Sequence, residues 1–447
     1  MGLGLPMDES RLERELAAWS ADPVPAHFPF APVVGAYHRV GKHFVSESLL
    51  KHLDVARSAL SQATCSQYSE YSDYSEYSDA PALARFLDVL LDKFDERYDY
   101  QTYLALSLLP MPAVGESPVA AATGGAAQRQ HDRLLVQLGM DALGFELAVL
   151  DGYSTLFPHL RPDPRVTAKR CRLGLRSLAP ALERLSLAPG LEHALRPGPN
   201  GDPLSAARQV CARVRADTSP KEQHVLDLTV LPVWTSHDEY LFIRVLQSFE
   251  TLFALLAVRL RAALDALATG RPDLAATPAA TLAATEVRKA EAALEESFRL
   301  FSLLATMQIQ SFQEFRRFTE GASAIQSRTY KLVESLCRIP DEARLDSPAY
   351  RSVPELRDRV AQGPPNLDDA VWHACHTGAL SAAERQDVTG ALHGFAAQLL
   401  QWRQTHYRLA VRMLGDRPGT GYTEGTPYLK AVRGIPVFLK ADPGAED

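Results

Sequence analysis

His406 is the residue whose position in this sequence best suits cofactor chemistry. It follows Trp402 by one helical turn and precedes Ala410 by another, on the apolar stripe of a predicted helix. A buried histidine needs partners for both ring nitrogens. Two alternatives therefore stay open: a core histidine bonded within the protein, which the spacing alone favours, or a ligand of a metal or haem iron.

Two other segments carry groups that bind anions. Arg316 and Arg317 stand among phenylalanines, where an arginine could clamp a carboxylate with two hydrogen bonds. The alternative, favoured by spacing alone, is that both stay solvated at a helix C-terminus. The segment from Asp416 to Tyr422 reads DRPGTGY, and such glycines let backbone N–H groups approach an anion. It follows a helix and lacks GK[ST], so it is no P-loop, and a plain turn is the alternative.

The remaining histidine and cysteine clusters are weaker candidates. His38 and His43 are five residues apart and fall on different helical faces, which disfavours a shared metal site. His373, Cys375 and His376 lack the second cysteine of the C-x-x-C-H motif for covalent haem attachment. We find no nucleophile elbow, H-E-x-x-H or dinucleotide fingerprint in the sequence.

The elements that must position these residues are predicted to be helices, and the fold class all-α. Apolar residues recur at spacings of three and four throughout. Two helices begin with a Ser-x-x-Glu capping box, at Ser236 and at Ser381, and the second runs through His406 to end before Gly415. Other helices are predicted over 44–60 (with Phe44 on the apolar face), 80–94, 131–150, 166–187 and 204–214, and over 286–318 as one helix or a broken pair. Loops are expected at 66–79, where Tyr, Ser and acidic residues alternate, and at 115–126, 197–203 and 270–278.

Composition sets the class of protein. The chain has 447 residues, of which 46% are hydrophobic and 23% charged, and this excludes a wholly disordered protein. The net charge of −7 gives no basic footprint, so no nucleic-acid partner is expected. The five cysteines are odd in number and far apart, which favours a reducing, cytoplasmic compartment. No uninterrupted apolar run reaches about 18 residues, so no membrane span is expected, and the N-terminus does not read as a secretory signal.

Four segments of the sequence together resemble the tryptophan 2,3-dioxygenase family. The helix from Ser236 (SHDEYLFI, then Gln247 and Glu250) resembles that family's first core helix, and YQTYLAL from Tyr100 resembles its Y-x-x-Y-L-x-L entry. Phe315-Arg316 with Gln326-Ser327 resembles the FR…GFQS segment. Trp402 and His406, followed by RMLGDRPGTG and a leucine, resemble the W-x-x-x-H…R-x-x-G-x-x-x-G-T-G…L signature.

The resemblance implies an all-α oxygenase that binds haem b and uses O₂ to oxidise an aromatic amino acid, tryptophan or a modified tryptophan. His406 would be the proximal ligand of the haem iron, and Arg316 would pair with the substrate carboxylate. Thr420 would hydrogen-bond the substrate ammonium or carboxylate, from a closing loop that includes Gly419 and Gly421.

The same resemblance implies the walls of the pocket. Phe242, Leu246 and Phe312 would lie near the substrate ring. Tyr100 and Tyr103 would lie at an active site, and the site of a neighbouring subunit is one alternative. A homodimer or homotetramer is implied, with the amino acid and O₂ as small-molecule partners and without nucleic acid or membrane.

Several positions depart from the family pattern. Leu246 stands where the family has a distal histidine that faces the indole N–H, and leucine can neither accept that hydrogen bond nor move a proton. Phe312 replaces a tyrosine, and Ala324 and Ile325 replace the Gly-Phe of GFQS. The pocket is therefore predicted to be more apolar than in the family. This keeps open an alternative in which one oxygen atom is inserted, as by a monooxygenase or hydroxylase of a tyrosine- or tryptophan-type substrate.

The family-like parts also suggest a domain organisation. Residues 98–110 and 236–439 would form the haem core, 1–97 a helical N-terminal extension, 111–235 a helical insertion and 440–447 a tail. Two alternatives of other classes remain: a non-catalytic haem-binding sensor, which would need neither Arg316 nor Thr420, and a helical scaffold that binds no haem.

Overall fold

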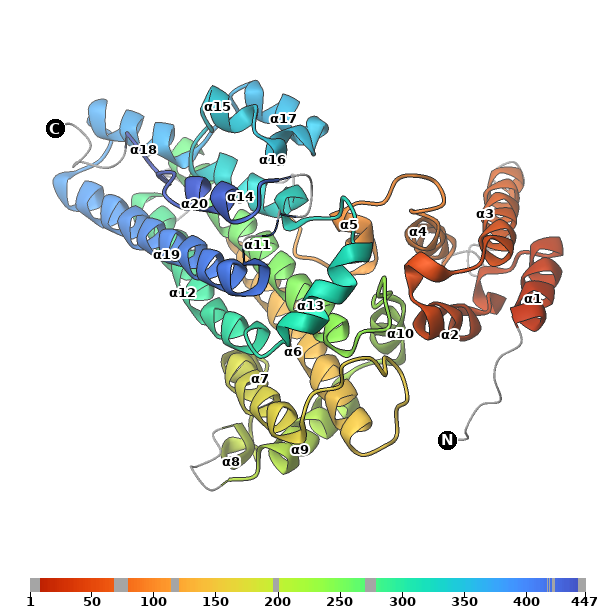
Figure 1. Ribbon diagram of the computed structural model, residues 1–447. Coiled ribbons are helices and arrows are strands. Elements are labelled where there is room, and N and C mark those ends of the chain that lie inside the picture. Colours follow the sequence, from red (N-terminus) through yellow and green to blue (C-terminus); the bar gives the residue numbers. More distant parts are fainter. Residues whose placement is uncertain are drawn as a thin grey trace.

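The computed structural model of the protein describes residues 9–67, 79–113, 120–195, 201–269, 279–415, 417, 419 and 423–440. Within these residues every regular element is a helix (Figure 1), and the backbone forms one isolated bridge, between His159 and Ser236. The predicted all-α class is therefore confirmed.

Three long helices form the centre of the molecule: α11 (His237–Thr269), α12 (Ala279–Leu304) and α19 (Ala382–Leu414). Helix α12 packs against both of the others, and α6 (Ala120–Leu150) packs along α11 (Figure 1). Their apolar faces share one hydrophobic core, in which Leu256, Leu294 and Phe395 are fully buried. Apolar residues at spacings of three and four make each helix bury one face, and this burial drives the packing.

Shorter helices cover this centre. They are α1 (Glu9–Ala21), α2 (Phe30–Val40), α3 (Glu47–Gln67), α4 (Ala80–Leu90), α5 (Tyr100–Tyr103), α7 (Pro164–Arg184), α8 (Glu192–Leu195), α9 (Pro203–Asp217), α10 (Pro220–Leu228), α13 (Ile309–Phe315), α14 (Arg328–Cys337), α15 (Glu342–Leu345), α16 (Pro348–Arg351), α17 (Pro354–Ala361), α18 (Leu367–His376) and α20 (Thr426–Val432). The 3₁₀ helices are η1 (Pro25–His27), η2 (Lys42–Phe44), η3 (Leu106–Leu108), η4 (Arg316–Phe318) and η5 (Ala324–Gln326).

Helices α6, α7 and α9, within the region predicted as an insertion, join the central core rather than forming one of their own. A Cβ atom added to Gly139 would lie 2.6 Å from Leu178 Cδ1, so α6 and α7 approach closely there. Fully buried Arg170 of α7 pairs with Glu146 of α6 at 2.5 Å and with Asp238 of α11 at 2.6 Å. A buried ion cluster thus ties this region to the first turn of α11. The division into extension, core, insertion and tail stays a prediction.

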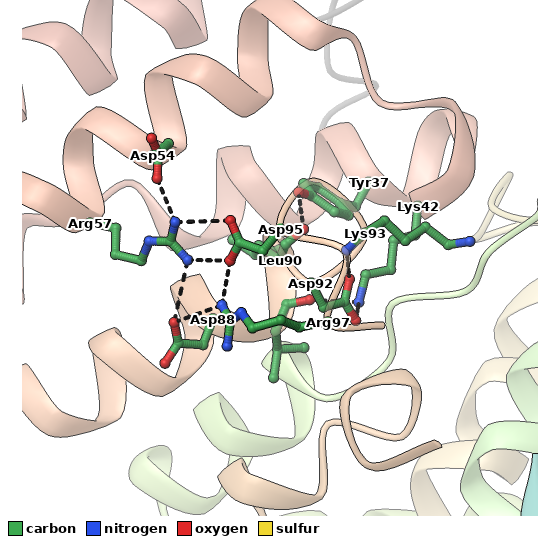
Figure 2. A network of polar contacts seen from close by, with 11 residues as sticks. Tyr37, Lys42, Asp54, Arg57, Asp88, Leu90, Asp92, Lys93, Asp95 and Arg97 are labelled. Carbon is green, nitrogen blue, oxygen red and sulfur yellow. Dashed lines mark hydrogen bonds and ion pairs between the residues drawn. The ribbon is translucent and has the colours of Figure 1, made fainter. Parts of the chain in front are cut away.

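The N-terminal helices α1 to α4 surround a second core, and they lie to one side of the long helices (Figure 1). Polar contacts run along the C-terminal side of α4 (Figure 2). Buried Lys42 Nζ donates to Asp92 Oδ2 at 2.6 Å, and the Tyr37 hydroxyl donates to Leu90 O at 2.9 Å. Arg57 is paired with Asp95 nearby. Burial lowers the pKa of Lys42, against the opposing charge of Asp92.

Two local predictions are wrong. Residues 120–126 were expected to be a loop because they are rich in Ala and Gly, but they form the first two turns of α6. Ala127 there packs against Leu255 and Val258 of α11, and this tertiary contact outweighs the weak local signal. Phe44 was expected on the buried face of a helix over 44–60. It ends η2 instead and is 44% exposed, while α3 begins at Glu47.

The two predicted capping boxes have different outcomes. Ser381 and Glu384 form the expected reciprocal box at the start of α19. At the start of α11, the Glu239 carboxylate instead accepts from the amides of Val233 at 2.7 Å and Trp234 at 3.1 Å. The Ser236 hydroxyl pairs with Ser311. The side chains of the Ser-x-x-Glu motif at Ser236 therefore bind other segments of the chain and do not form a reciprocal capping box.

Other predictions concern loops and helix breaks. The region over 286–318 is a broken pair, because α12 ends at Leu304 and α13 begins at Ile309. Most of the predicted loop at 66–79, all of that at 270–278 and part of those at 115–126 and 197–203 lie outside the described residues.

Helix α11 contains the stretch His237–Ala268, which is long and apolar enough to cross a membrane by length and composition. In the structure, 94% of its most apolar window is buried inside the protein. A core helix passes the same test.

Candidate active site

A cavity of about 260 Å³ lies between α11, α12, α13, α14, α19 and α20. Its lining is mainly apolar and aromatic. Besides the residues predicted from the sequence, it includes Phe249, Phe253, Phe301, Met307, Leu409 and Met413. A largely apolar cavity with a few polar groups is the usual form of a small-molecule site.

His406 contributes its imidazole to this cavity from α19. Its ring lies 5.5 Å from that of Trp402 and 6.3 Å from that of Phe301, between centroids. Among the described residues, no hydrogen bond or charge contributes to the state of this imidazole. Burial lowers the pKa of His406 to about 4, so the imidazole is neutral near pH 7. A core histidine would have bonds to both nitrogens, and this one keeps a free lone pair toward the cavity.

Two aromatic segments line the cavity near Leu246. Phe242 lies one helical turn before Leu246 on α11, and its ring is 5.9 Å from that of Phe312 and 5.2 Å from that of Phe315. Leu246 is buried on the same helix face. The predicted Phe242, Leu246 and Phe312 are thus brought together, and the wall they form has no hydroxyl or imidazole.

Arg316 enters the cavity from η4, directly after α13. Its side chain is half-buried, whereas neighbouring Arg317 is exposed. Burial, and then the charge of Arg417, lower the pKa of Arg316. A guanidinium in these surroundings gains from a carboxylate ligand, because the ligand offsets both the lost solvation and the repulsion.

Tyr100 and Tyr103 line the cavity of their own chain. Both are buried, and burial is the largest cause that raises the pKa of each. The Tyr103 hydroxyl donates to Glu239 at 3.1 Å, and the Tyr100 amide donates to Gln326 Oε1 at 3.0 Å. Both tyrosines thus lie at the cavity of their own chain, and their predicted place at an active site, of this or of a neighbouring subunit, stays a prediction.

The loop after α19 reaches the cavity at Gly419. The Gly419 amide donates to Thr423 O at 3.0 Å. A Cβ atom at this position would lie 2.1 Å from Thr423 Oγ1 and 3.0 Å from the Gly425 Cα. Any larger residue must displace backbone there. Thr420 and Gly421 lie outside the described residues, so their predicted roles stay predictions.

Sequence reasoning gave no role to a set of buried charges that also line the cavity. Glu334 accepts from Arg344 at 3.0 Å and from Arg403 at 3.2 Å, and Arg403 Nε donates to the Tyr330 hydroxyl at 2.7 Å. Glu250 is buried one turn after Leu246, and burial is the main cause that raises its pKa. The sequence offered one signal for Arg403 and Glu250: both lie within segments that resemble the family. Glu334 and Arg344 had none.

Comparison with known proteins identifies relatives of this chain. No family model matches the chain. It is 30% identical over 221 residues to a tryptophan 2,3-dioxygenase from a Nocardioides species, and this match covers 44% of the chain and 80% of the relative. The chain belongs to the tryptophan 2,3-dioxygenase family. It is also 28% identical to the enzyme of that name from Burkholderia lata (46% of the chain, 75% of the relative) and 27% identical to that from Pseudomonas aeruginosa (47% and 82%).

These matches leave more than half of the chain without a counterpart in the dioxygenases compared. The chain is thus a divergent member of the tryptophan 2,3-dioxygenase family with a large added part.

Proposed function

We propose that the protein is a haem-dependent oxygenase of an aromatic amino acid, tryptophan or a modified tryptophan, with O₂ as second substrate. One observation carries the proposal: a single cavity receives the neutral imidazole of His406, the guanidinium of Arg316 and a wall of aromatic rings. The names of the relatives, tryptophan 2,3-dioxygenases, support the same reaction class.

The residues present fit haem. A neutral, half-buried histidine on a long helix could hold haem iron, and such a site would need no cluster of protein donors. No group of three or more His, Cys, Asp or Glu side chains suited to a metal ion occurs among the described residues. When bound, haem would supply the iron at which O₂ is activated for insertion into the substrate.

The chain's own residues would bind and orient the amino acid. Arg316 offers a planar fork for the carboxylate, and Phe242 and Phe312 offer an apolar slot for the ring. Leu246 can hold the ring by packing but offers no acceptor for an N–H group. Proton transfer to or from the ring therefore cannot depend on a side chain at this position.

The experiment is a reaction of the purified haem-loaded protein with tryptophan under ¹⁸O₂, followed by mass spectrometry of the product. We expect two ¹⁸O atoms in a ring-opened product. A single ¹⁸O atom would favour the monooxygenase alternative, and haem binding without any turnover would favour a sensor.

Two neighbouring arginines give a matched pair of variants. Arg316→Ala is expected to abolish most turnover at low amino-acid concentration, while Arg317→Ala, whose side chain is exposed, should keep it. Equal activity of both variants would show that Arg316 does not bind the substrate.

A further inference from the structure

We propose that Lys93, with His43 and Phe44, is a latch on the segment that carries Arg316, and that this latch sets the affinity for the substrate carboxylate. These three residues lie in the N-terminal region, outside the parts that resemble the dioxygenase family. The proposal rests on the proposed function and assigns positioning residues to it.

The first contact is polar and acts on the backbone just after Arg316. Lys93 Nζ donates to the carbonyl oxygen of Phe318 at 3.1 Å and pairs with the Glu320 carboxylate at 3.0 Å. His43 Nδ1 lies 3.2 Å from the same carboxylate. The Lys93 side chain is 16% exposed, so its ion pair is partly shielded from solvent.

The second contact is aromatic. The Phe318 ring lies 5.1 Å from that of His43, 5.0 Å from that of Phe44 and 5.3 Å from that of Trp234, between centroids. Such edge and tilted pairs are attractive beyond the effect of the area that they bury. This contact also explains why Phe44 stays outside the N-terminal core.

The latch holds a backbone segment in a conformation that is locally unfavourable. Glu320 has φ of 46°, in the left-handed region, which is unfavourable for a residue with a Cβ atom. Between Arg316 and Glu320 the chain is tight, because Thr319 Oγ1 donates to Arg316 O at 2.8 Å. A shift of Phe318 or Glu320 is therefore passed to Arg316 within one helical turn.

Lys93 is itself held in place. Its Nζ atom lies 4.0 Å from the centroid of the Tyr98 ring, and its backbone amide donates to Asp92 Oδ1 at 2.6 Å. Figure 2 shows the Lys93 side chain extending away from the Lys42–Asp92 pair. The buried pair thus fixes the base of Lys93, and its amine is left for the Arg316 segment.

The test compares Lys93→Met with Lys93→Arg, and uses Arg97→Met as a matched control. Arg97 pairs only with Asp88 and Asp95 among the described residues, within the N-terminal region (Figure 2). For haem-loaded protein we expect Lys93→Met to raise KM for tryptophan about tenfold, an effect of about 1.4 kcal/mol. The maximal rate, the Soret band and the binding of tryptamine, which has no carboxylate, should stay within twofold. Lys93→Arg should restore most of the affinity, and Arg97→Met should not change it.

Two results would overturn the latch: an unchanged KM in Lys93→Met, or an equal weakening for tryptophan and tryptamine, which would mean general loosening. A second readout needs neither haem nor substrate. Hydrogen exchange of amides 316–327 should be faster in Lys93→Met than in Arg97→Met, and equal exchange rates contradict the latch. If the wild-type protein bound no tryptophan, the proposed function would fail, and the exchange result would still decide the latch.

Discussion

The helix wall and the arginine segment form the cavity in different ways. The helix wall consists of α11, α12 and α19 and carries Leu246, Phe301 and His406. Its shape follows from apolar faces that pack over many turns. The arginine segment, residues 305–327, is a series of short helices and turns that carries Phe312 and Arg316. Short helices are not stable alone, so this segment depends on contacts made by other parts of the chain.

Those contacts come partly from the predicted extension and insertion and partly from the helix wall itself. At the start of the segment, Arg170 Nε donates to Thr306 Oγ1 at 3.1 Å, and Asp238 accepts from the Gln308 amide at 2.7 Å. At its end stand Lys93 and His43. The proposed cofactor side of the cavity is therefore formed by the helical bundle, whereas the proposed substrate side also depends on contacts from the predicted extension and insertion.

The largest effect is expected at the arginine segment. Replacing Arg316 by alanine removes a charged hydrogen-bond fork from a half-buried site, and this should cost about 2–3 kcal/mol of amino-acid binding, or about 100-fold in affinity. Arg316→Lys should recover only part, because an ammonium cannot form the fork. Titration followed through the haem spectrum measures both. Similar affinity in the two variants would show that charge alone suffices.

Helix α6, which packs along the helix wall at α11, has a weak point of its own, His131. Burial lowers the pKa of His131 to about 4, from an unfolded value near 6.5. Below pH 6.5 the unfolded chain takes up a proton that the folded chain refuses, so stability falls as pH falls. Between pH 7.5 and 5 this one group should cost about 2 kcal/mol. Denaturant unfolding at both pH values, in wild type and His131→Gln, measures the difference.

In His131→Gln the loss between those pH values should be smaller by that amount. Part of the acid sensitivity will remain, because burial also lowers the pKa of His38. An identical pH dependence in both proteins would show that His131 titrates normally.

The sequence predicted the helix wall better than the arginine segment, and the reason is physical. The stripe through Phe395, Leu399 and Trp402 repeats at helical spacing and is buried as expected. The break after Leu304 depends on Arg170 and Asp238, which are far away in the sequence. Glu239 likewise looked like a capping residue because its tertiary partner, Tyr103, cannot be read locally. The cavity residues themselves were found through the family motifs, and their roles stay predictions.

The loop after α19 is a third part of the cavity, besides the helix wall and the arginine segment. Gly419→Ala places a Cβ atom against the backbone of Gly425, which must move. We expect about tenfold weaker tryptophan binding, with the Soret band unchanged. Gly434→Ala is the control, because a Cβ atom there meets nothing within 4 Å. Equal binding by both variants would show that the loop tolerates the shift.

The smallest expected effect is that of dilution on the specific activity. Because Tyr100 and Tyr103 line the same cavity as Arg316 within one chain, we expect each chain to form this part of the cavity by itself. Specific activity should therefore stay constant on dilution through the concentration at which any oligomer, dimer or tetramer, dissociates. Activity assays paired with light scattering test this. A loss of activity that follows dissociation would mean that a neighbouring subunit contributes to the site.

The most direct measurement is a haem titration of wild type, His406→Ala and Arg316→Ala side by side, each followed by addition of tryptophan. We expect a stoichiometric Soret band in wild type and Arg316→Ala, and we expect this band to be lost or displaced in His406→Ala. Tryptophan should then perturb the band in wild type alone. An unchanged band in His406→Ala, or an unchanged response to tryptophan in Arg316→Ala, would contradict the division between a cofactor side and a substrate side.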